Sequence, residues 1–154
     1  MGQFFQGDVQ EPVGKSSDIA QAGGGQVAAK SPFNRKAITE GFQDHHIVSD
    51  KNPLTKNHEL LDAADFDLQS RANKMFLPED AAQHLTRSIH SGRHTTAVSR
   101  NLAVQMDEVL EIGKQSGWTQ VEYNQALRAI IGQERQMLRS GQRALNVNAR
   151  PGAQ

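Results

Sequence analysis

The sequence contains no cysteine, which excludes disulfide bonds and thiolate metal sites. It also has no run of about 20 apolar residues, the length that a membrane helix requires, so we expect no membrane association. No basic start followed by an apolar stretch is present either, which predicts the absence of a secretory signal peptide. The protein is then either cytoplasmic or exported by a route that needs no cleaved signal.

The chain also lacks an overall charge, because 17 basic residues balance 17 acidic ones. The two halves differ, however. Residues 1–70 hold 6 Lys or Arg and 10 Asp or Glu, whereas residues 71–154 hold 11 and 7. Arginine outnumbers lysine by 9 to 2 in the second half. Guanidinium groups bind phosphates and the carboxylates of a protein partner equally well, so the charge alone selects neither ligand.

A length of 154 residues suits one domain with a tail. Residues 1–36 contain three successive glycines, two prolines and few apolar residues, and we interpret them as a flexible linker or arm. The arm either joins the domain to something larger or is an ordinary flexible terminus. We expect the folded domain to cover residues 37–142 and the last residues, 143–154, to be a frayed tail.

Short apolar runs predict a β-hairpin with an insertion. The run 46–48, with its β-branched Ile47 and Val48, indicates a first strand. Residues 73–77 alternate enough to form a second strand that Pro78 ends. Between them, the apolar positions of residues 57–70 share one helical face, and Asn57 is a suitable N-cap.

The second half of the chain has helical patterns. Acidic residues at 79 and 80 suit the start of a helix over 79–90, and a second helix is expected over roughly 94–115. Thr119 and Glu122 match a capping box that opens a third helix, which continues to about residue 140. The last two helices are expected to pair as an antiparallel hairpin. The predicted fold class is therefore α+β, mostly α, with a small hairpin-and-helix core and a C-terminal helical hairpin.

Histidines are few but clustered, since four of the six fall in two short motifs. His45 and His46 are neighbours on the first strand, where successive side chains point to opposite faces. One imidazole can therefore face a metal while the other faces a water molecule or a phosphate. Such a pair suits hydrolysis, because imidazole titrates near neutral pH and can act as a general base.

His90 and His94 lie four residues apart, a spacing that places both on one face of a helix, although Gly92 makes a regular helix less secure. Two ligands from this segment and one from the hairpin would leave an open coordination position, which is typical of a catalytic ion. One divalent metal ion is expected. Three neutral imidazoles favour a transition metal (Zn²⁺, Ni²⁺ or Mn²⁺), whereas cellular abundance favours Mg²⁺.

Three motifs in a fixed order carry a family resemblance over roughly residues 40–112. They are His-His-Ile-Val from residue 45, Asn-x-x-x-Leu-Pro from residue 73 and His-Ser-Gly-Arg-His from residue 90. This order resembles the AHH branch of the HNH/endonuclease VII nucleases. Those proteins have the ββα-metal fold and occur as toxin tips of bacterial polymorphic and type VI secretion effectors.

The resemblance implies a role for each matching residue. His46 matches the general base, and Asn73 matches the asparagine that ties the hairpin loop and so holds the base in place. Arg93 contacts a phosphate or is simply a solvated charge. The implied metal ligands are His45, His90 and His94.

The chain departs from the family pattern at Asp44, where the family has alanine. Asp44 could bond to an imidazole that binds the metal and so raise its basicity. Alternatively, the motif aligns in a register one residue earlier, with Asp44 as the metal ligand and His45 as the base. We prefer the first register, because Ile-Val follows His46 as it follows the base in such motifs. The two remaining histidines have no metal role: His58 is expected to be structural and His84 to be exposed.

The resemblance implies a metal-dependent endonuclease that acts on DNA, with RNA as an alternative substrate. It also implies an antibacterial toxin that is made in the bacterial cytoplasm, is delivered by a secretion system into a target cell's cytoplasm and has a cognate immunity protein as partner. With one Trp and one Tyr, the chain lacks base-stacking platforms, so we expect it to contact the nucleic-acid backbone with little selectivity.

Two other hypotheses fit the same histidines. One is an interaction module in which His45, His90 and His94 hold a structural zinc ion. The other is a metal-independent ribonuclease toxin that uses His46 and His94 as an acid–base pair. The sequence does not indicate an oligomeric state.

Overall fold

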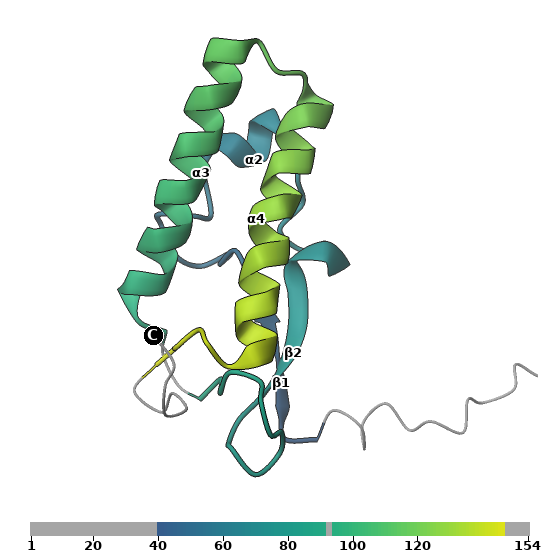
Figure 1. The fold of residues 1–154 in the computed structure, drawn as a ribbon, viewed down its shortest axis with the longest axis vertical. Helices are drawn as coiled ribbons and strands as arrows, with labels where there is room; N and C mark the ends of the chain where they lie inside the picture. Colours follow the sequence, from purple (N-terminus) through teal and green to yellow (C-terminus); the bar gives the residue numbers. More distant parts are fainter. Residues whose placement is uncertain (1–39, 92–93, 147–154) are drawn as a thin grey trace, which may run out of the picture. The chain divides into compact units, whose positions relative to one another are not determined.

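The computed structural model describes residues 40–91 and 94–146, so the predicted arm at 1–36 lies outside the described residues. Within those ranges the chain forms a two-stranded sheet and three α-helices (Figure 1). The α+β, mostly α prediction is therefore confirmed. In chain order the elements are β1 (Phe42–His46), α2 (Glu59–Ala63), the 3₁₀ turn η1 (Arg71–Asn73), β2 (Lys74–Pro78), α3 (Thr96–Ser116) and α4 (Gln120–Ser140).

The two strands form an antiparallel hairpin with a long insertion. His45 pairs with Met75 and His46 with Lys74, and the Ile47 N–H donates to the Asn73 carbonyl at 2.8 Å just beyond the ladder. The first strand therefore ends where the sequence predicted that it would begin. The two residues after His46, Ile47 and Val48, are buried in the core beneath the insertion.

The inserted helix is shorter than predicted. It covers Glu59–Ala63 rather than residues 57–70, and its N-cap is His58 rather than Asn57. The His58 Nδ1 atom accepts the Leu60 N–H, and its Nε2 atom lies 3.0 Å from Asp107 Oδ1 on α3. One imidazole thus caps the start of α2 and joins it to α3. The helix ends early because the chain turns at Asp65, which has a φ of 46°.

The two long helices lie side by side and antiparallel, as the sequence predicted (Figure 1). The capping box is present: the Thr119 side chain accepts the Glu122 N–H while the Glu122 carboxylate accepts the Thr119 N–H. Gly117 ends α3 with a φ of 65°, a left-handed conformation that favours glycine. None of the helices in the described ranges has the length and apolar character that crossing a membrane requires. Buried side chains from both helices fill the core, among them Leu102, Met106, Leu110, Leu127 and Ile131.

The helix predicted over residues 79–90 is wrong, because this segment folds as successive turns. Side chains accept backbone N–H groups along the segment, including that of Thr86, which a helix over 79–90 would bond to the Ala82 carbonyl. Gln83 Oε1 accepts the Glu79 N–H at 2.8 Å, Asp80 Oδ1 accepts the Ala82 N–H at 2.7 Å, and His84 Nδ1 accepts the Thr86 N–H at 3.2 Å. Local side-chain bonds of this kind compete directly with helix formation.

The start of the predicted frayed tail is packed against the domain. Leu145 is fully buried, and the Arg143 guanidinium makes two bonds of 2.6 Å to the Glu134 carboxylate on α4. The prediction of fraying is thus wrong for residues 143–146, whose apolar and charged side chains find partners on the folded domain. Residues 147–154 lie outside the described residues.

Candidate metal centre

Alternation along β1 separates the three successive residues Asp44, His45 and His46. His45 pairs with the buried Met75 and is itself only 3% exposed, so its imidazole points into the domain. Asp44 and His46 project from the opposite face of the strand. The strand therefore presents one histidine to the interior and the next to the outer face, as the sequence predicted.

Three imidazoles meet inside the domain. The ring centroids of His45 and His90 are 5.0 Å apart, those of His45 and His94 are 4.9 Å apart, and those of His90 and His94 are 4.6 Å apart. One nitrogen from each ring lies within 4.8 Å of the others, close enough for the three rings to hold a metal ion together.

Unpaired nitrogens support the same interpretation. His45 Nδ1 and His94 Nε2 are buried and have no hydrogen-bond partner among residues 40–91 and 94–146. An unpaired buried polar atom is unfavourable unless a ligand satisfies it. Three imidazoles with free nitrogens at this spacing fit a divalent transition metal.

Burial keeps these imidazoles neutral. It lowers the pKa of His45 well below its ordinary value, and the neighbouring His94 and His90 lower it further. Burial, followed by the effect of His90, lowers the pKa of His94 to about 4, and burial also lowers the pKa of His90. Neutral imidazoles offer lone pairs, so the cluster can bind a cation at neutral pH without first releasing protons.

Residues 90–91 and 94–95 precede α3 and are not helical, so these described positions do not form the helical face that the spacing of His90 and His94 suggested. The segment is tied to the hairpin instead. The His90 N–H donates to the Pro78 carbonyl at 2.7 Å, and His90 Nδ1 lies 2.6 Å from Gln43 Oε1. Because an amide oxygen only accepts, Nδ1 carries the proton and Nε2 is left free for a metal.

Gln43 is a site residue that sequence reasoning missed. Its Nε2 atom donates to Glu79 Oε1 at 2.9 Å, so a carboxylate orients the amide that orients His90. The available signal was its position two residues before His45, which places both side chains on the same face of the strand.

His46 lies outside the three-imidazole cluster and is held by a different amide. Its Nε2 atom lies 3.1 Å from Gln69 Oε1, and Gln69 Nε2 donates to Asp50 Oδ2 at 3.0 Å. The accepting amide oxygen places the proton on Nε2 and leaves Nδ1 as the basic nitrogen. Sequence reasoning missed Gln69 and Asp50, because both lie in the irregular insertion and carry no periodic signal.

Asn73 joins the two ends of the insertion that follows His46. It is fully buried, its Oδ1 accepts the Val48 N–H at 2.8 Å, and its Nδ2 donates to the carbonyls of Val48 and Leu68, both at 2.9 Å. These three bonds join both ends of the loop that follows β1. Arg93, the remaining predicted site residue, lies outside the described residues.

Asp44 is not part of the cluster. Its carboxylate lies 4.0 Å from Lys74 Nζ on the outer face of the hairpin, and its side chain is 42% exposed. The structure thus brings His45, not Asp44, to the other two histidines, which favours the first register. Asp44 still lines the cleft described below, whereas the two histidines without a predicted metal role do not: His58 caps α2, and His84 packs edge-on against Phe42 with ring centroids 6.5 Å apart.

One cleft of about 780 Å³ includes all four motif histidines. The inner cluster and the outer-face His46 therefore line the same space. Polar residues of the insertion and of the start of α3 complete its wall, among them Ser49, Asp50, Lys51, Asn52, Thr96 and Ser99. A ligand in the cleft can therefore reach His46 and the three-imidazole cluster at the same time.

Comparisons with known proteins agree with this geometry. A family model matches residues 28–134, and its description is a nuclease family of the HNH/ENDO VII superfamily with conserved AHH. Neither the curated proteins nor the solved structures gave a match. The chain has Asp44 where the family motif has alanine, yet the match covers the hairpin, the cluster, α3 and most of α4. The chain belongs to the AHH nuclease family of the HNH/ENDO VII superfamily.

Proposed function

We propose that this nuclease is a metal-dependent endonuclease that hydrolyses the phosphodiester bonds of DNA with little sequence selectivity. One observation carries the proposal: three neutral imidazoles and a separately held fourth imidazole share a single polar cleft. The first three form a ligand set with room for a substrate, and the fourth is placed for proton transfer.

The proposed ligands of one divalent ion are His45, His90 and His94. Their nitrogens favour Zn²⁺ or another transition metal such as Ni²⁺ or Mn²⁺, while Mg²⁺ is the abundant cellular alternative. When bound, the ion supplies Lewis acidity that stabilises negative charge on phosphate oxygens. The protein holds His45 by burial in the core and His90 through Gln43, so both rings keep their orientation.

His46 is the proposed general base. With its proton held on Nε2 by Gln69, its Nδ1 atom is free to accept a proton from the attacking water. Asn73 positions this imidazole indirectly, because it fixes the backbone that follows the strand. Arg93 is proposed to contact a substrate phosphate.

A backbone-directed substrate is supported by arginines beside β2. The Arg135 guanidinium donates to the Ala72 carbonyl, Arg71 lies over the Phe76 ring, and the charges of Arg139 and Arg71 help burial to lower the pKa of Arg135. Within the described ranges, none of these three arginines forms an ion pair with an acidic residue. Uncompensated positive charge of this kind suits phosphates.

The proposed biological role is that of an antibacterial effector toxin. It would be delivered by a secretion system into a rival cell's cytoplasm and neutralised in the producing cell by a cognate immunity protein. This part of the proposal is supported by the likeness of the motifs to toxin-tip nucleases and by the glycine-rich start, which suits a linker to a delivery protein. Growth arrest on expression in a bacterial cytoplasm, relieved by His46→Ala, is the result expected.

Cleavage of supercoiled plasmid by the purified protein tests the enzymatic proposal. The reactions contain Mg²⁺, Zn²⁺ or EDTA, and the variants are His46→Ala, His94→Ala and the control His84→Gln. We expect cleavage that requires metal, loss of cleavage with retained metal binding in His46→Ala, and weakened metal binding in His94→Ala. His84→Gln changes a histidine outside the cleft and should cleave normally.

Two other outcomes would contradict the proposal and favour one of the alternative functions. RNA cleavage that persists in EDTA would identify a metal-independent ribonuclease, although the low pKa of His94 makes it a poor partner for acid–base work at neutral pH. Unfolding in EDTA with no cleavage of either nucleic acid would identify a structural zinc site.

A further inference from the structure

The proposed metal ligands His90 and His94 lie between β2 and α3, where the described residues 79–91 and 94–95 include no helix or strand. A piece of chain far away in the sequence packs against this ligand segment. We propose that residues 143–146, here called the C-terminal strap, position these two ligands and thereby set the affinity for the metal. The inference rests on the proposed metal site. It assigns Asn146 and Arg143 as positioning residues, neither of which was expected to be ordered.

Three hydrogen bonds join the strap to the ligand segment. Ser88 Oγ donates to the Arg143 carbonyl at 2.7 Å, and the Asn146 side chain donates to the Ser91 carbonyl. The Thr95 N–H donates to the Leu145 carbonyl at 2.9 Å. The contacted residues stand two before His90, one after it and one after His94, so the strap holds the segment on both sides of the ligands.

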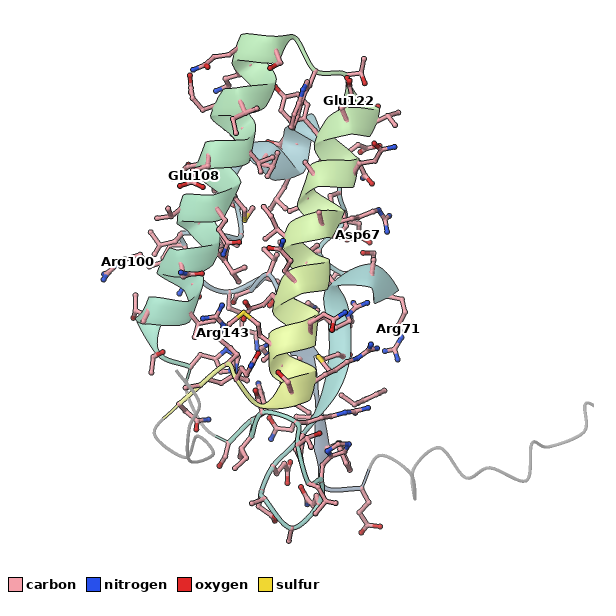
Figure 2. All side chains as sticks on the ribbon, in the orientation of Figure 1. Asp67, Arg71, Arg100, Glu108, Glu122 and Arg143 are labelled. Atoms are coloured by element: carbon pink, nitrogen blue, oxygen red, sulfur yellow. The ribbon has the colours of Figure 1, made fainter. Side chains whose placement is uncertain are left out.

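The strap is itself fixed to the body of the domain. The Arg143 guanidinium makes a bidentate pair with Glu134, which is only 3% exposed, and the Arg143 N–H donates to the Met137 carbonyl at 3.3 Å. Figure 2 shows Arg143 beside the C-terminal end of α4. Leu145 adds a fully buried apolar anchor. The bidentate ion pair and the buried leucine fix the position of the strap. The strap can therefore restrict the positions of the residues in the ligand segment to which it is hydrogen-bonded.

The ligand segment depends on contacts with other elements, because its described residues form no secondary structure of their own. Among residues 79–91 and 94–95 there is no helix or strand, and Thr95, the N-cap of α3, makes no side-chain capping bond. Bonds from the His90 N–H to Pro78 and from Ser88 N–H to Leu138 hold its first part, and the strap holds the part that leads into α3. The family match ends at residue 134, so the strap lies beyond the matched region.

Paired amide-to-carboxylate substitutions test this inference in the full chain. Asn146→Asp keeps the side-chain shape, removes the donor to the Ser91 carbonyl and adds a charge that repels it. Gln142→Glu makes the same chemical change at an exposed neighbour. Zn²⁺ affinity is measured by competition with a chelator, and thermal unfolding is followed separately in EDTA. We expect roughly tenfold weaker Zn²⁺ binding for Asn146→Asp and unchanged binding for Gln142→Glu.

A second variant tests another contact between the strap and the ligand segment. Ser88→Ala removes the bond to the Arg143 carbonyl without adding charge, and it should also weaken Zn²⁺ binding while the metal-free protein stays folded. If both variants lower only the unfolding temperature in EDTA and bind Zn²⁺ as the wild type does, the strap is merely structural. Failure of the wild type to bind any metal would instead overturn the proposed metal site, and the strap's role with it.

Discussion

Two amide side chains, Asn73 and Gln69, hold the proposed base His46 in different ways. Asn73 is buried and bonds only to backbone, so it acts on the loop that follows the strand. Gln69 is exposed and bonds to the imidazole itself, so it acts on the position of one proton. Substitutions at the two positions should therefore affect different measured quantities.

Replacing Asn73 by alanine should destabilise the protein. The variant leaves the Val48 N–H and the carbonyls of Val48 and Leu68 without their partner, and each unsatisfied buried group costs about 1–3 kcal/mol. We predict a decrease of roughly 3 kcal/mol in the free energy of unfolding, measured in urea, because relaxation recovers part of the loss. An unchanged urea midpoint would show that the loop does not depend on these bonds.

Replacing Gln69 by alanine should instead lower turnover and leave stability unchanged. Without the amide acceptor, the His46 proton is no longer fixed on Nε2, so the fraction of imidazole with a basic Nδ1 decreases. We predict about a tenfold lower kcat at unchanged KM, a part of the roughly 100- to 10,000-fold that a general base contributes. Nitrogen NMR of the ring should report the mixed tautomer.

Two comparison variants separate this effect from simple loss of surface contacts. Gln69→Glu keeps an acceptor at the same position and should keep the Nε2–H tautomer, whereas Gln136→Ala removes an exposed glutamine of α4 far from the cleft. Normal turnover in Gln69→Ala, or equal losses in Gln136→Ala, would rule out the positioning role of Gln69.

At the residue level the sequence predicted the four motif histidines and Asn73, because their order along the chain is itself a signal. It did not predict Gln43, Gln69 or Asp50. The contacts of these residues depend on which strand face or loop approaches which ring, and that is decided by tertiary structure. The structure brings three of the histidines together, and the chemical roles remain predictions.

At the level of elements, prediction succeeded where the signal is local. The capping box of α4 and the glycines after both long helices mark their ends through bonds within a few residues. Prediction failed over residues 57–70, where the chain turns at Asp65 with a φ of 46°, and over residues 79–90, where the His84 imidazole accepts the N–H groups of Thr86 and Arg87 instead of leaving them to a helix. The packed residues 143–146 were missed because their partners are distant in sequence.

The ion pair between α4 and the strap is the clearest element-level contact to test. Arg143→Met leaves the buried Glu134 carboxylate without its partner, and breaking such a pair typically costs about 3–5 kcal/mol. The double variant Glu134→Leu with Arg143→Met removes both charges and should recover much of that loss. Both values come from denaturant unfolding. Equal stability of the single and the double variant would mean that the charge pair itself contributes little.

At the scale of the whole molecule, the net charge is zero although residues 71–154 carry more basic than acidic side chains. Figure 2 shows Arg71 on the side of η1 and β2 and Arg100 on the far side of α3. If the arginines beside β2 contact the nucleic-acid backbone, Arg71→Ala should weaken DNA binding and reduce the slope of log affinity against log salt by about 1. Arg100→Ala removes an equally exposed charge and should leave the slope unchanged.

That comparison is best made in the His46→Ala background, in which we expect DNA to be bound but not cut. An Arg71 variant with the wild-type salt slope would show that this side of the hairpin does not contact the substrate. Loss of slope in both arginine variants would instead indicate nonspecific attraction by the whole surface.

The stability of the metal-free protein should depend on pH because the cluster is held neutral. In the unfolded chain a histidine takes up a proton near pH 6.5, whereas in the folded protein burial lowers the pKa of His94 to about 4 and lowers those of His45 and His90 as well. Between these values the unfolded state binds more protons, so the free energy of unfolding rises with pH. The contribution is fully present above about pH 6.5 and is lost as pH falls toward 4.

Thermal unfolding in EDTA between pH 4.5 and 7.5 measures this dependence, and His94→Asn, which cannot titrate, should show a shallower slope. Saturating Zn²⁺ should raise the unfolding temperature at pH 7.5, because a ligand that binds only the folded state stabilises it. The increase should shrink as pH falls, since protons compete for the same nitrogens. A Zn²⁺ effect that is equal at both ends of this range would contradict metal binding by neutral imidazoles, whatever the protein cleaves.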